Sequence, residues 1–105
     1  MNSTATNPVT LVNVFSVEPA KQQELLDSLR HNTETVIKTL KGWNTTSLIQ
    51  SNDGKRIVIC SQWDSAADID AMRADPRMQA YFPVVAQIAS SFESTIGTVA
   101  VAHQR

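Results

Sequence analysis

The stretch of residues 56–82 constrains the fold more than any other part of the chain, because a strand and two helix starts follow one another within it. Its first part reads Arg-Ile-Val-Ile-Cys-Ser-Gln-Trp, which is rich in β-branched residues and ends on a large ring. This composition predicts a strand over residues 56–63. Because Trp63 ends the strand just before two helices begin, we expect its ring to form a pocket wall.

Two helix-start signals follow this strand. Ser65 and Asp68 are three residues apart, which is the spacing of a capping box with Asp in place of the usual Glu or Gln. Asp75 precedes Pro76, which combines a capping side chain with a proline suited to the first turn. The sequence therefore predicts a short helix and then a second one, with a kink or restart near Phe82 because a proline follows it.

Hydrophobic spacing predicts the remaining elements. Apolar and β-branched residues predict strands over residues 9–17, 43–51 and 92–102, and apolar residues at helical spacing predict a helix over residues 19–41. An Asn-Asp-Gly turn at residues 52–54 joins two strands as a hairpin. The resulting order is β-α-β-β-α-β, which predicts a ferredoxin-like α+β fold, an antiparallel sheet with its helices on one face.

The face of this sheet that the helices leave uncovered is too apolar to contact water. Val12, Val14, Val58 and Cys60 share it by strand parity. Pairing with a second copy of the chain, one sheet face against the other, would bury these side chains. We therefore expect a homodimer.

Length and charge restrict the classes of protein to which this chain can belong. A chain of 105 residues is the size of one domain, which we assign to residues 9–105, with residues 1–8 as a flexible polar tail. A net charge of −1 argues against a nucleic-acid partner. The chain has no apolar run that could span a membrane and no signal-peptide pattern at its start. One cysteine excludes an intrachain disulfide, and we expect a cytoplasmic location.

Asn13 is the polar member of an otherwise apolar strand face. An amide in such a place needs hydrogen-bond partners, and two interpretations are open. Backbone groups or water satisfy it, or it faces a cavity and binds a polar group of a ligand. Trp63 and Tyr81 carry the same pair of interpretations, because large rings are common in cores as well as in sites.

Several short motifs are typical of one family. They are Gln62-Trp63-Asp64-Ser65 at a strand end, Ala74-Asp75-Pro76-Arg77 with Ala80-Tyr81 at a helix start, Lys41-Gly42-Trp43 before a strand, and Asp53-Gly54 in the hairpin turn. On these residues the chain resembles the antibiotic biosynthesis monooxygenase domain family over residues 9–102. The resemblance implies a dimeric α/β barrel, in which the sheets of two copies pair.

The oxygenases of that family imply a chemistry without metal or flavin, so no cofactor is expected. A phenolic, quinol or anthrone-type aromatic is deprotonated, its anion passes an electron to O₂, and the radical pair recombines. The protein supplies an apolar pocket with a few placed polar groups and excludes water. The resemblance and the strand and helix patterns together predict Asn13, Trp63 and Tyr81 as catalytic residues and Phe15, Met72, Phe82 and Val85 as substrate-binding walls.

Three polar positions of family members are apolar here, namely Ile59, Ile69 and Met72. These departures leave two alternatives to the cofactor-independent monooxygenase. One is a non-catalytic binder of a small apolar ligand or haem, although Tyr81 stands where haem-degrading relatives carry a histidine. The other is a small isomerase, whose acid–base pair would have to be Tyr81 with His31 or His103.

Overall fold

The computed structural model describes residues 8–105, so the predicted tail over residues 1–8 lies outside the described residues except for its last residue. Two short 3-10 helices, η1 and η2, flank the first α-helix. The elements are β1 (Val9–Ser16), η1 (Pro19–Lys21), α1 (Gln22–Thr35), η2 (Ile37–Thr39), β2 (Trp43–Gln50), β3 (Arg56–Trp63), α2 (Ala66–Ala74), α3 (Pro76–Ile88) and β4 (Ser91–Gly97).

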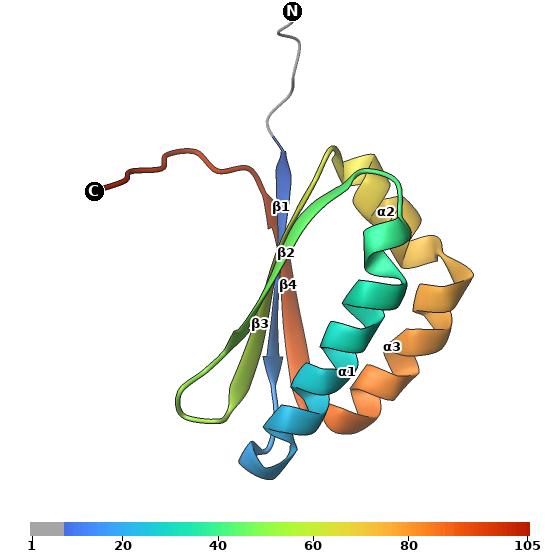
Figure 1. The fold of residues 1–105 in the computed structure, drawn as a ribbon, viewed down its shortest axis with the longest axis vertical. Coiled ribbons are helices and arrows are strands. Elements are labelled where there is room, and N and C mark those ends of the chain that lie inside the picture. Colours follow the sequence, from blue (N-terminus) through green and yellow to red (C-terminus); the bar gives the residue numbers. More distant parts are fainter. Residues whose placement is uncertain (1–7) are drawn as a thin grey trace, which may run out of the picture.

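The four strands form one antiparallel sheet in the order β2-β3-β1-β4, so β3 and β1 are central and β2 and β4 are edges. The helices α1, α2 and α3 all lie on one face of this sheet (Figure 1). This arrangement confirms the predicted α+β fold and its β-α-β-β-α-β order, with the second helical segment divided into α2 and α3. No helix within residues 8–105 is long and apolar enough to cross a membrane.

The sheet face beneath the helices carries the hydrophobic core. Leu11 and Phe15 of β1 and Ile57 and Trp63 of β3 are buried there. The buried residues form two clusters, one that includes Phe15 and Ile57 and one that includes Leu11 and Trp63. The central strands therefore present mainly apolar side chains toward the helices, with Asn13 and Ser61 as polar members of this face.

Both predicted helix caps are confirmed. The Ser65 hydroxyl accepts a hydrogen bond from the Asp68 backbone N–H at 3.2 Å, at the start of α2. The Asp75 carboxylate accepts one from the Arg77 backbone N–H at 2.8 Å, at the start of α3. Asp75 itself has an extended backbone, which separates the two helices and lets each turn its apolar side toward the sheet.

The helix predicted over residues 19–41 is interrupted, contrary to expectation. α1 ends at Thr35, and Val36 leaves the helical region with φ −120° and ψ −61°. The hydroxyls of Thr33 and Thr35 each donate to the carbonyl group four residues earlier, at 2.8 Å. Such bonds compete with the backbone bonds of a helix and bend it, and β-branched residues crowd the same turn.

Near the C-terminus the structure shows no helix restart at Phe82, and the predicted end of the last strand was wrong. α3 continues through Pro83 as one helix, with Met78 and Val85 on either side of the proline both buried in the core, so the kink that was expected as the alternative to a restart stays a prediction. β4 ends at Gly97 and not near residue 102. Gly97 pairs with Thr10, and β1 begins only one residue before Thr10, so no strand is left for later residues to pair with.

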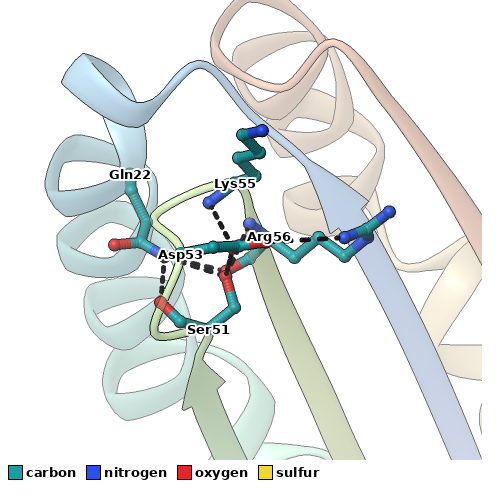
Figure 2. Close-up of polar contacts among 5 residues, drawn as sticks. All are labelled: Gln22, Ser51, Asp53, Lys55 and Arg56. Carbon is teal, nitrogen blue, oxygen red and sulfur yellow. Dashed lines mark hydrogen bonds and ion pairs between the residues drawn. The ribbon is translucent and has the colours of Figure 1, made fainter.

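Gln22 joins the start of α1 to the β2–β3 hairpin (Figure 2). Its buried side-chain nitrogen donates to the backbone carbonyls of Ser51, at 3.1 Å, and Arg56, at 3.0 Å. Within the turn, the Asp53 carboxylate accepts from the backbone N–H of Lys55 and from the Ser51 hydroxyl, and these bonds lower the pKa of Asp53. The hairpin is thereby anchored to the helical layer, which fixes the register of the strand that ends on Trp63.

Candidate active site

A cavity of about 570 Å³ lies between the sheet and the helices. This volume falls in the range of small-molecule sites, which is roughly 300–1,000 Å³. All seven residues that the sequence predicted for the site line this cavity: Asn13, Phe15, Trp63, Met72, Tyr81, Phe82 and Val85. They come from β1, β3, α2 and α3, so the fold brings together segments that are far apart in the chain.

The cavity has a closed side and an open side. Leu11, Trp63 and Met78 are buried members of its lining and form the closed side. Phe82 and Phe92 also line it, yet they are 39% and 60% exposed. The opening therefore lies between α3 and the edge strand β4, and the indole of Trp63 lies at depth.

Trp63 is held in one orientation. Its side chain is 1% exposed, and its indole N–H donates to the Ser61 hydroxyl, two residues earlier on the same strand face, at 3.1 Å. A buried indole usually finds such a partner, because an unpaired N–H is costly away from water. The ring thus serves the core and the cavity wall at once, and the two interpretations of Trp63 do not exclude each other.

Tyr81 places a phenol on the cavity wall. Its hydroxyl forms a 2.8 Å hydrogen bond with the Ser28 hydroxyl of α1. Burial raises the pKa of Tyr81, and the bond to Ser28 partly opposes this effect. A phenol with a raised pKa keeps its proton at neutral pH, so Tyr81 is suited to donate a hydrogen bond or a proton and not to act as the resting base.

The Tyr81 pKa can be measured directly, because the chain contains one tyrosine. In a tyrosinate absorbance titration we expect the midpoint above the ordinary value of 10.0. The stability contributed by this group is then complete below pH 10 and is lost as the pH rises through the folded pKa. Ser28→Ala should raise the midpoint further, because the lost hydrogen bond lowers it. A midpoint at or below the ordinary value would contradict the buried placement.

Asn13 and Asn32 bring amides to the cavity from opposite layers. Asn13 lies on β1, where it pairs in register with Ile59 and Ser94. Asn32 lies on α1, is buried, and donates to the Met78 sulfur at 3.4 Å. The structure places Asn13 in the cavity lining, and its role in ligand binding stays a prediction.

Sequence reasoning missed Asn32 and Arg73, which also line the cavity. A signal was present for both. Asn32 continues the helical stripe of Leu25 and Leu29 at a spacing of three residues, and Arg73 lies four residues after Ile69, which is buried. A polar residue that falls at helical spacing from buried apolar residues is easily interpreted as solvent-exposed.

The acid–base pair of the isomerase alternative is not assembled in the cavity. His31 and His103 are both exposed, and neither belongs to the cavity lining. Cys60 lies on the uncovered sheet face, half-buried and as a free thiol, away from the helices. Within residues 8–105 no group of three His, Cys, Asp or Glu side chains could hold a metal ion.

Together these features define a small α+β protein with an apolar cavity, lined by rings, between one sheet and its helices. The family model described as antibiotic biosynthesis monooxygenase matches residues 8–84. Tetracenomycin-F1 monooxygenase of Streptomyces glaucescens is 41% identical, across 82% of this chain and 86% of that protein. The chain therefore belongs to the antibiotic biosynthesis monooxygenase family.

Two solved structures show the same fold at lower identity. The ActVA-Orf6 monooxygenase of Streptomyces coelicolor, solved with the ligand nanaomycin D, has a TM-score of 0.84 and 21% identity, covering 94% of this chain and 93% of that one. SnoaB, a cofactor-independent oxygenase from Streptomyces nogalater, has a TM-score of 0.73 and 18% identity, covering 95% of this chain and 97% of that one.

Proposed function

We propose that this protein is a cofactor-independent monooxygenase that oxidises a phenolic, quinol or anthrone-type aromatic with O₂. The observation that carries the proposal is the cavity, which combines aromatic and aliphatic side chains with amides and hydroxyls and ends on a buried indole. The identity of 41% with tetracenomycin-F1 monooxygenase supports the reaction type. The description of SnoaB as cofactor-independent supports a reaction without metal or flavin.

The proposed reaction uses the substrate as its own source of electrons. For an anthrone, loss of a proton gives an anion, which passes one electron to O₂. The two radicals combine into a peroxide, and the peroxide loses water as the new carbonyl forms. One oxygen atom of O₂ enters the product and the other leaves as water, so atoms and electrons balance.

Each predicted catalytic residue has a distinct proposed role. Trp63 stacks against the flat substrate, and the Asn13 amide donates a hydrogen bond to the oxygen on which the anion develops. Tyr81, which keeps its proton, donates to the peroxide as water leaves. Within residues 8–105 no Asp, Glu or His lines the cavity, so we propose that the first proton passes to water.

We also propose that two copies pair through the uncovered sheet face. Val12, Val14, Val58 and Cys60 are only half-buried there, and Ile49 of β2 is 51% exposed. A second copy would cover these side chains and so stabilise a chain of modest core size. Sedimentation equilibrium should give about twice the 11.5 kDa chain mass. A monomer at micromolar concentration would contradict the pairing, and the cytoplasmic location stays a prediction.

Oxygen uptake by purified protein, assayed free of metal and flavin, tests the activity. Anthrone, hydroquinones and tetracenomycin F1 are suitable substrates, and heated protein corrects for autoxidation. We expect oxygen uptake well above autoxidation. We expect Tyr81→Phe to lower kcat by a larger factor than it changes KM. Saturable quenching of tryptophan fluorescence without oxygen uptake would contradict the oxygenase and favour the binding-only alternative.

A further inference from the structure

Arg73 is the one charged residue in the cavity lining within residues 8–105. It lies in the last turn of α2 and is half-buried. One of its terminal guanidinium nitrogens donates to the Ser94 hydroxyl of β4 at 3.1 Å. The residue therefore connects the helical layer to the edge strand beside the cavity opening, where Ser94 is exposed.

Arg73 differs from the other arginines that lie on helices or strands. None of the ion pairs formed within residues 8–105 includes it, whereas Arg30, Arg56 and Arg77 each pair with an aspartate. Its partner Ser94 is a neutral hydroxyl. A half-buried guanidinium beside apolar side chains, with one donor used on a neutral group, has donors left for a planar anion.

The position of Arg73 suits a carboxylate of the substrate better than the reacting oxygen on which the anion develops. The reacting oxygen of the substrate belongs at depth, beside the buried ring of Trp63. A carboxylate is ionised at neutral pH and is costly to bury completely, so it belongs at the opening, where it keeps contact with water. The planar fork of arginine matches a carboxylate with two parallel hydrogen bonds.

We propose that Arg73 is a substrate-binding residue that selects aromatics with a carboxylate on the ring edge facing the opening. The guanidinium binds this carboxylate and thereby orients the opposite ring edge toward Trp63 and Tyr81. This inference rests on the proposed function for the identity of the bound molecule as substrate. It specifies the chemical class of substrate that the cavity prefers and the orientation of that substrate in the cavity.

The test compares two ligands that differ in one charge, 1,4-dihydroxy-2-naphthoate and its neutral carboxamide. Calorimetric titration under argon measures binding without turnover. The wild-type protein should bind the acid at least tenfold more tightly than the amide. Arg73→Gln should weaken acid binding by about 10- to 100-fold, the range expected for hydrogen bonds to a charged group, and leave amide binding within about threefold.

Arg30→Gln is the matched control, because it removes the same charge from an exposed position outside the cavity lining. It should keep the preference for the acid. Equal affinity of the wild type for the two compounds, a preference that persists in Arg73→Gln, or no binding of the acid would each overturn the proposal. Binding under argon is independent of oxygen uptake, so a preference for the acid without uptake would refute the oxygenase and leave the role of Arg73 standing.

Discussion

Trp63→Ala is expected to lower the free energy of unfolding by about 3–5 kcal/mol, which is the usual cost of removing a buried aromatic ring. The ring is 1% exposed and packs in the cluster that includes Leu11, Ile69 and Met78. Its removal would join a void to the existing cavity, where neighbours held by the sheet have little room to collapse. A loss of this size is a large share of the stability of a domain this small.

Urea unfolding followed by circular dichroism measures this loss. Trp43→Ala is the matched control, because Trp43 is the only other tryptophan, is half-buried, and donates its indole N–H to the Thr46 hydroxyl at 2.8 Å. We expect its loss to be clearly smaller. Equal losses in the two variants, or a loss below about 1 kcal/mol for Trp63→Ala, would contradict the central position given to this ring.

Asn13→Ala is expected to lower kcat about 100-fold while KM changes by only a few fold. Removing one donor that stabilises a developing oxyanion typically costs 10²–10³ in kcat. Asn13 lines the cavity from a central strand whose register with β3 and β4 is fixed, so its backbone position is set before the substrate arrives. The effect should fall on the transition state and not on ground-state binding.

Steady-state oxygen uptake separates the two parameters. Asn44→Ala is the control, because Asn44 is exposed on β2 and does not line the cavity. It should leave both parameters unchanged. A rise in KM at constant kcat for Asn13→Ala would reassign Asn13 to ground-state binding, and no change in either parameter would remove it from the mechanism.

Local sequence patterns were sufficient to predict the sheet and the helix starts. Strand parity placed Phe15 and Trp63 on the buried face, and the caps at Ser65 and Asp75 fixed where α2 and α3 begin. These features depend on residues that are close together in the chain. The predicted site residues could be gathered into one cavity because the expected topology brings the two central strands and α3 together.

The missed features depend on contacts between distant segments. The Tyr81–Ser28 hydrogen bond joins residues 53 apart in the chain, and the end of β4 depends on where β1 begins. Arg73 was missed because a lone arginine near a helix end usually points to solvent. Its hydrogen bond with Ser94 requires the edge strand to lie opposite α2, and no local sequence pattern predicts that arrangement.

Oxygen insertion is tested by mass spectrometry of the anthrone oxidation product formed under ¹⁸O₂ by protein assayed free of metal and flavin. We expect one ¹⁸O atom in the new carbonyl and the second in water. An unlabelled product, with O₂ recovered as hydrogen peroxide, would contradict oxygen insertion and show that the protein oxidises its substrate without transferring oxygen to it.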